Sequence, residues 1–206
     1  ELIKRAIRKH KKVIFNGNGY TEEWIKEAEK RGLYNLVSTP DCLPRFIADK
    51  NIQLFEKHHI FTREEIFSRY EILLENYVKT IEIEAKTLKE MLLKDFLPAV
   101  SSYASTVAEN TMSVKTFVPS MDTASAQSLV SSLGDAYEKI LDSLKELEKE
   151  LPTIEQFQSV QESADYCHKT VLATMALLRS YADQAEEKIP ESHLPYPTYD
   201  RLLFSI

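Results

Sequence analysis

Apolar side chains recur every three or four residues over three long stretches of this sequence. The first stretch runs from Tyr70 to Phe96, the second from Leu133 to Leu151 and the third from Phe157 to Ala185. Steps of three and four keep side chains on one face of an α-helix, because one helical turn takes about 3.6 residues. The pattern therefore predicts three long amphipathic helices.

The glycine content points the same way. Four glycines occur in 206 residues, whereas average usage is about 7%. Sandwiches and barrels depend on tight turns that favour glycine, so they are disfavoured. The predicted fold is all-α: short helices in residues 1–60, an elongated antiparallel bundle of three long helices in residues 61–190, and an extended tail in residues 191–206.

Capping signals and prolines set the expected ends of the long helices. Residues 62–65 read as a capping box that begins the first helix. Pro98 either bends this helix or breaks it, which would give a four-helix count. We expect Leu151-Pro152 to end the second helix, and a second capping box at residues 153–156 to begin the third.

The first sixty residues read as small helices. Residues 1–12 form an amphipathic pattern with a basic back, and Asn16-Gly17-Asn18-Gly19 predicts a turn because Gly and Asn tolerate positive φ. A helix capped by Thr21 follows and ends at Gly32. Residues 40–58 predict one broken helix or two short ones.

Composition excludes several classes of protein. The formal charge of −6 argues against nucleic-acid binding, and no run of 18 apolar residues predicts a membrane span. Two lone cysteines, Cys42 and Cys167, fit a reducing cytoplasm. The chain starts at Glu1 without a secretory signal, so we expect it to be part of a longer cytoplasmic protein.

Three constellations suggest chemistry, and each has a plainer explanation. Residues 13–19 resemble a phosphate-binding turn, but Glu22 stands where a third glycine belongs. Glu56 and His59 form one Glu-x-x-His pair, whereas a di-iron bundle needs two. Cys167 and His168 are adjacent, so on a helix they point about 100° apart. The sequence therefore predicts no catalytic, cofactor-binding or metal-binding residue.

Two further surfaces lack an evident partner. The basic run in residues 4–12 is local in an acidic chain, so we expect a solvated face or a contact with an upstream part of the protein. The apolar end of the tail is expected to dock on something; it comprises Leu202, Leu203, Phe204 and Ile206.

Several stretches resemble one enzyme family. Residues 10–24 contain Asn16, Gly17, Asn18, Gly19, Tyr20 and Trp24 and are the most specific match. With residues 27–33, 54–62, 68–72, 83–87 and 195–204, they look like the C-terminal region of type III glutamine synthetases. Residues 100–190 carry the resemblance only through their helical pattern.

The resemblance implies a parent enzyme that makes glutamine from glutamate and ammonia, using ATP and a divalent metal such as Mg²⁺. It also implies a homo-oligomer of two stacked six-membered rings. The catalytic motifs of such enzymes lie upstream of the matched region. Glu29-Lys30-Arg31 sits at a predicted helix end rather than on a strand, so no catalytic residue is carried over.

Two roles follow for the segment itself. In the first, residues 1–60 close off an upstream catalytic domain and the bundle has a structural or oligomerisation role. In the second, the bundle is a docking module for a regulatory protein or a small effector. An independent catalyst is the least favoured reading, because no reactive cluster is present.

Overall fold

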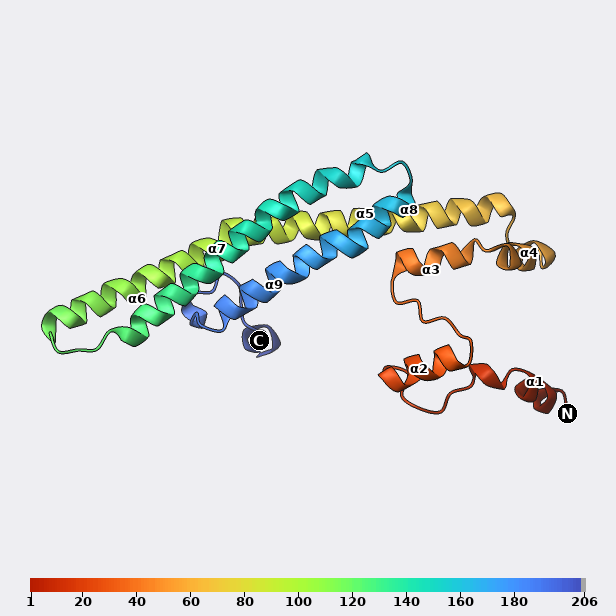
Figure 1. Ribbon diagram of the computed structural model, residues 1–206, viewed down its shortest axis with the longest axis horizontal. Coiled ribbons are helices and arrows are strands. Elements are labelled where there is room, and N and C mark those ends of the chain that lie inside the picture. Colours follow the sequence, from red (N-terminus) through yellow and green to blue (C-terminus); the bar gives the residue numbers. More distant parts are fainter. Residues whose placement is uncertain (205–206) are drawn as a thin grey trace.

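The computed structural model describes residues 1–204, and these residues contain helices and no strand, as predicted (Figure 1). One continuous helical rod dominates the molecule. It consists of α5 (Arg63–Met91), a π-helical turn (Leu92–Phe96) and α6 (Leu97–Phe117). Two more long segments pack against the rod. They are α7 (Ala124–Thr153), and α8 (Val160–Tyr166) joined through a second π turn (Cys167–Val171) to α9 (Leu172–Glu186).

The expected capping box at the start of the rod is confirmed. The Glu65 amide donates to Thr62 Oγ1 at 3.3 Å, and the Thr62 amide donates to Glu65 Oε2 at 2.7 Å. Pro98 neither ends nor interrupts the rod. It lies in the first turn of α6, directly after the π turn, and helical backbone angles continue through Leu97. The π turn adjusts the hydrogen-bonding register where the proline lacks a donor.

The expected start of the third helix is wrong. Pro152 does not end α7, which continues to Thr153, and residues Ile154–Gln156 form a 3-10 turn. The capping box is instead Ser159 with Glu162, and α8 begins at Val160. The Thr153 hydroxyl donates back to the carbonyl of Lys149 at 3.0 Å, so the side chain belongs to α7. Burial of Ile154 draws the chain into the core before the new helix begins.

The core lies along the seam of the three long segments. The predicted stripes supply most of it, including the fully buried side chains of Leu74, Leu133, Ile140, Leu147, Val171 and Leu178. Leu97 and Val100, which follow the π turn, are also fully buried and had not been predicted. Several tyrosines lie at the edges of this seam, and Tyr70, Tyr77 and Tyr181 are half-buried. Burying these apolar side chains supplies the main driving force for the bundle.

The first sixty residues form short helices, as predicted. They are α1 (Leu2–Lys9), a 3-10 turn (Lys11–Val13), α2 (Glu22–Lys30), α3 (Thr39–Phe46) and α4 (Asp49–Lys57). Residues 40–58 thus make two short helices. α3 and α4 pack on α5, whereas α1 and α2 extend away from the bundle (Figure 1).

The tail differs from the expected extended segment. It contains a 3-10 turn (Glu191–His193) and a short helix, α10 (Tyr199–Phe204). The Tyr196 hydroxyl donates to Asp95 Oδ2 at 2.8 Å, which holds the tail against the first π turn. The side chains of Leu202, Leu203 and Phe204 are largely exposed, at 59%, 73% and 76% of their surfaces. Ile206 lies outside the described residues.

Candidate functional site

The motif of residues 16–24 forms a small aromatic unit in the arm, which we define as residues 1–37. The rings of Phe15 and Trp24 lie 4.4 Å apart. Arg31 fastens this unit from the end of α2: its Nη1 donates to the carbonyl of Ile14 at 2.7 Å, and its Nε pairs with Glu27 Oε1 at 2.6 Å. Both contacts show that Arg31 stabilises the local fold at a helix end.

The turn itself is built differently from the expectation. Of the glycines, only Gly32 has a positive φ, 70°, so left-handed backbone does not explain Gly17 or Gly19. Gly17 instead makes room for an aromatic ring, because a Cβ there would lie 2.4 Å from Phe15 Cζ. Asn18 holds the turn, since its Oδ1 accepts the Tyr20 amide at 3.0 Å.

The helix after this turn begins and ends as predicted, with one exception. Thr21 occupies the N-cap position of α2, but its hydroxyl donates to the Asn18 carbonyl at 3.0 Å and makes no cap hydrogen bond. At the other end, Gly32 donates to the Glu29 carbonyl and Leu33 to the Ala28 carbonyl, at 2.9 and 2.8 Å. This is a Schellman motif, which satisfies the last helical carbonyls.

The arm carries a large exposed apolar surface. Its predicted apolar face on α1 is largely uncovered within residues 1–204, where Leu2 and Ile3 are 72% and 75% exposed. Further along the arm, Val13, Tyr20, Tyr34 and Val37 are also exposed. Leu2, Ile3 and Ile7 share one face of α1, and an exposed apolar face is typical of contacts with other parts of a protein.

A buried polar chain ties the start of the bundle to α3. The Tyr70 hydroxyl on α5 donates to Gln161 Oε1 on α8 at 2.7 Å, and Gln161 Nε2 donates to the Pro40 carbonyl at 3.1 Å. Pro40 is buried. α3 is therefore fixed to the bundle, and the arm before it contacts α3 through Tyr34, whose ring centre lies 4.5 Å from the guanidinium carbon of Arg45.

The side chains that suggested chemistry are not brought together. His58 and His59 end α4, as expected, and His59 has a positive φ of 52°. Cys167 is fully buried on the seam, and burial raises the pKa of its thiol to about 11. His168 Nδ1 lies 3.5 Å from the Tyr77 hydroxyl. A thiol with so high a pKa is a poor nucleophile at neutral pH.

One buried charged side chain was missed by the sequence analysis. Glu150 lies on α7 with only 6% of its surface exposed. Its Oε1 accepts the Thr174 hydroxyl at 2.7 Å, and its Oε2 has no hydrogen-bond partner. Desolvation raises the pKa of this carboxyl. The available signal was its position three residues after Leu147, which places it on the apolar face of the helix.

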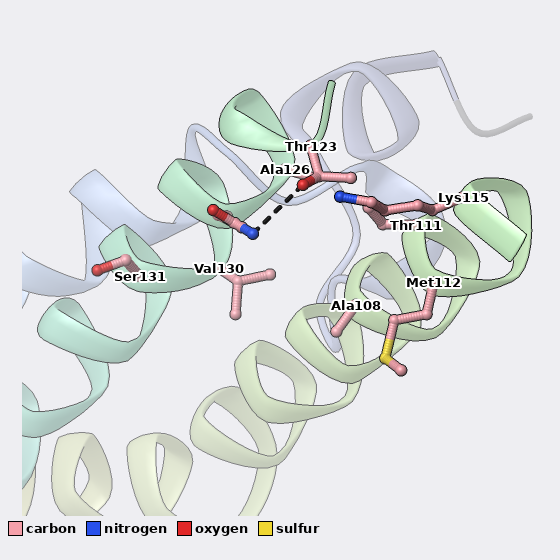
Figure 2. Close-up of a pocket in the computed structure, with 9 residues that line it drawn as sticks. Ala108, Thr111, Met112, Lys115, Thr123, Ala126, Val130 and Ser131 are labelled. Atoms are coloured by element: carbon pink, nitrogen blue, oxygen red, sulfur yellow. Dashed lines mark hydrogen bonds between the residues drawn. The ribbon is translucent and has the colours of Figure 1, made fainter. Parts of the chain in front are cut away.

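An apolar groove lies at the far end of the α6–α7 hairpin (Figure 2). This groove has a volume of about 410 Å³. α6 contributes Ala108, Thr111, Met112 and Lys115, and the start of α7 with the residue before it contributes Thr123, Ala126, Gln127, Val130 and Ser131. Lys115 is the only charged residue in this lining.

Comparison with known proteins identifies the family. Residues 1–115 match the glutamine synthetase C-terminal domain, which is more than half of the chain. The chain belongs to this family. The predicted resemblance to the C-terminal region of type III glutamine synthetases is thereby confirmed.

Relatives extend the similarity over the whole chain. A glutamine synthetase of Butyrivibrio fibrisolvens is 44% identical over 206 residues, which is 100% of this chain and 29% of the relative. A type-3 glutamine synthetase of Dictyostelium discoideum is 33% identical over 99% of this chain and 28% of its own length. A glutamine synthetase of Bacteroides fragilis is 24% identical over a similar span. The chain thus spans less than a third of these relatives.

Among residues 1–204, no three His, Cys, Asp or Glu side chains lie close enough to hold a metal ion. The donor set therefore does not fit the divalent metal that the family resemblance implies for the parent enzyme. Nor is any described helix both long and apolar enough to cross a membrane.

Proposed function

We propose that this chain is a non-catalytic C-terminal part of a cytoplasmic glutamine synthetase that joins glutamate and ammonia at the expense of ATP. Support comes from its relatives, which are named as glutamine synthetases and are more than three times its length. The ATP, the divalent metal and the reacting groups belong, in this proposal, to an upstream catalytic domain.

The exposed face of the arm is the observation that carries the proposal. The bundle buries its own seam, whereas Leu2, Ile3 and Ile7 of α1 remain 72%, 75% and 51% exposed. An amphipathic helix of eight residues has little stability in water unless its apolar face is covered. The upstream domain of the same polypeptide supplies that cover, and residues 1–60 close off its surface.

The bundle takes a structural role in this proposal, in assembly of a homo-oligomer. Its core is apolar along the seam except at Glu150, the thiol of Cys167 is buried, and its polar contacts link helices to one another. These features stabilise a rigid projection rather than a reaction centre.

The arm contact can be tested in the full-length enzyme. Ile3→Asp combined with Ile7→Asp places two charges on the apolar face of α1, so glutamine formation and thermal stability should both fall sharply. Arg8→Asp introduces the same side chain on the opposite face and serves as the control. Wild-type activity and stability in the double variant would contradict a contact with the catalytic domain.

The absence of catalysis in this segment has its own test. The purified 206-residue chain should neither hydrolyse ATP nor form glutamine, whereas the full-length protein should do both in the same assay. Reproducible turnover by the segment alone would overturn a non-catalytic role.

A second candidate function is a docking module for a regulatory protein or a small effector. The groove at the hairpin tip favours it, since an apolar hollow of about 410 Å³ is large enough for a small ligand. Calorimetric titration of the full-length protein with candidate effectors would test it.

A further inference from the structure

The α6–α7 hairpin continues beyond the third segment of the bundle. α9 stops at Glu186, and the tail meets α6 near Tyr103, whose ring lies 5.1 Å from that of His193 (Figure 1). Within residues 1–204, α6 packs mainly on α7 and meets the Glu191–His193 turn near Tyr103, and the groove lies between α6 and α7 at the end of the hairpin (Figure 2). In residues 1–204, the hairpin tip therefore contains two packed helices, α6 and α7, whereas the rest of the bundle contains three.

The same hairpin is almost free of charge. Residues 97–134 contain three charged side chains, Glu109, Lys115 and Asp122, although 28% of the whole chain is charged. Two molecules of net charge −6 would repel each other over most of their surface, but not here. Depletion of charge is also characteristic of the core of protein interfaces.

The outer face of α6 is self-complementary. Met112 is 72% exposed and forms one edge of the groove. Glu109 lies three residues before it and Lys115 three residues after it, so both flank Met112 on one helical face. Small residues of the same face, Ser105 and Ala108, leave room for a close approach. Within residues 1–204, neither Glu109 nor Lys115 forms a salt bridge.

We propose that two copies of this chain pack hairpin against hairpin, with their α6 helices antiparallel and crossing at Met112. An antiparallel pair centred on Met112 places Glu109 opposite Lys115 of the partner subunit, and the reverse, so two ion pairs form from one symmetric contact. The four helices then make a four-helix bundle that covers both grooves. This inference deepens the proposed assembly role, on which it rests.

The charges favour a second copy over other occupants. An acidic or basic partner would match one of Glu109 and Lys115 and oppose the other, whereas an identical helix in antiparallel orientation matches both. The exposed apolar side chains around the tip add to the surface that the contact would bury; they include Phe117 at 91%, Val118 at 45% and Met121 at 38%.

Cysteine cross-linking in the full-length protein tests the geometry directly. Cys42, which is exposed, is first replaced by serine, and Met112→Cys is introduced. In the proposed pair, position 112 of one copy faces position 112 of the other across the symmetry axis. Their Cα atoms should lie within the roughly 4.4–6.8 Å that a disulfide needs. Mild oxidation should therefore convert most of the protein to a covalent dimer. Asn110→Cys, on the opposite face of α6, is the matched control and should stay monomeric under denaturing conditions. Absence of a Met112→Cys dimer, or an equal yield from Asn110→Cys, would overturn the proposal.

Charge exchange provides an independent test. Lys115→Glu places a carboxylate opposite Glu109 of the second copy, so it should reduce the yield of the Met112→Cys dimer several-fold. Adding Glu109→Lys restores opposite charges across the contact and should restore the yield. Failure of the restoring variant, or a Met112→Cys adduct with a different protein in place of a dimer, would refute self-association. These outcomes do not depend on catalysis. A Met112→Cys dimer in a protein without ligase activity would support the contact between the two copies and would contradict only the proposed glutamine synthetase activity.

Discussion

Glu150 shows how one residue can link the stability of the bundle to pH. Its carboxyl lies in the seam, where Thr174 satisfies one oxygen and the other has no partner. Burial raises the pKa of Glu150, so the folded state holds its proton more tightly than the unfolded state does. The negative charge of Glu146, on the same helix, also raises the pKa of Glu150. The phenol of Tyr166 on α8 is the other titratable group of this region, and burial and the charge of Glu150 raise its pKa.

We therefore expect Glu150 to weaken the fold as pH rises. Its stabilising contribution is fully present below the unfolded pKa and is lost as pH passes through the raised folded pKa. Glu150→Gln should remove this loss and raise the free energy of unfolding at pH 8 by about 1–3 kcal/mol, with a smaller gain at pH 4.5. Urea denaturation at both pH values measures this difference. Glu138→Gln, at an exposed position on the same helix, is the control, and an equal gain at both pH values in Glu150→Gln would contradict the prediction.

The packing of Gly17 under Phe15 can be followed through the single tryptophan of the chain. Gly17→Ala should push Phe15 off Trp24, because the new Cβ would overlap the Phe15 ring. Exposure of the indole should shift its fluorescence emission to longer wavelength. Gly19→Ala has open space at its Cβ and should leave the spectrum unchanged. Identical spectra for both variants would show that Phe15 and Trp24 do not pack as described.

Among the helices, the two capping boxes contribute most clearly to where the long segments begin. Ser159→Ala removes the hydroxyl that accepts the Glu162 amide at 3.2 Å, and loss of such a cap costs about 0.5–2 kcal/mol. Thermal or urea unfolding should show this loss for Ser159→Ala and for Thr62→Ala. Ser128→Ala, at an exposed position inside α7, should have little effect. No change in Ser159→Ala would argue that α8 starts elsewhere.

The same helices show the limit of local signals. Two sequences resembled a capping box, residues 62–65 and residues 153–156, and only the first is one. The second failed because Thr153 remains in α7 and Ile154 is buried. A capping residue is local, but the choice between neighbouring candidates depends on which apolar side chain the core accepts.

The whole molecule divides into a self-sufficient bundle and an uncovered arm. Leu178→Ala, at a fully buried position, should lower the free energy of unfolding of the 206-residue chain by about 2–5 kcal/mol. Ile3→Ala in the arm should change it by less than about 0.5 kcal/mol, since that side chain is largely uncovered within residues 1–204. Urea denaturation followed by circular dichroism compares the two. A large effect of Ile3→Ala would mean that the arm packs on the bundle.

The sequence by itself determined the all-α class, the three long segments, most of the seam residues and the family. Helical periodicity is a local property, and burying an apolar stripe leaves few alternatives once three such stripes are joined by short loops. The roles of Gly17 and Arg31 were not visible, because each depends on contacts made only after the chain has folded.

The tertiary structure alone decided where α9 ends relative to the α6–α7 hairpin, and that Glu150 faces the seam. Both depend on how far the helices slide along one another and rotate about their axes. Periodicity fixes which face of a helix is apolar, but the packing of side chains against their neighbours fixes the alignment of whole helices. The open groove at the hairpin tip follows from that alignment.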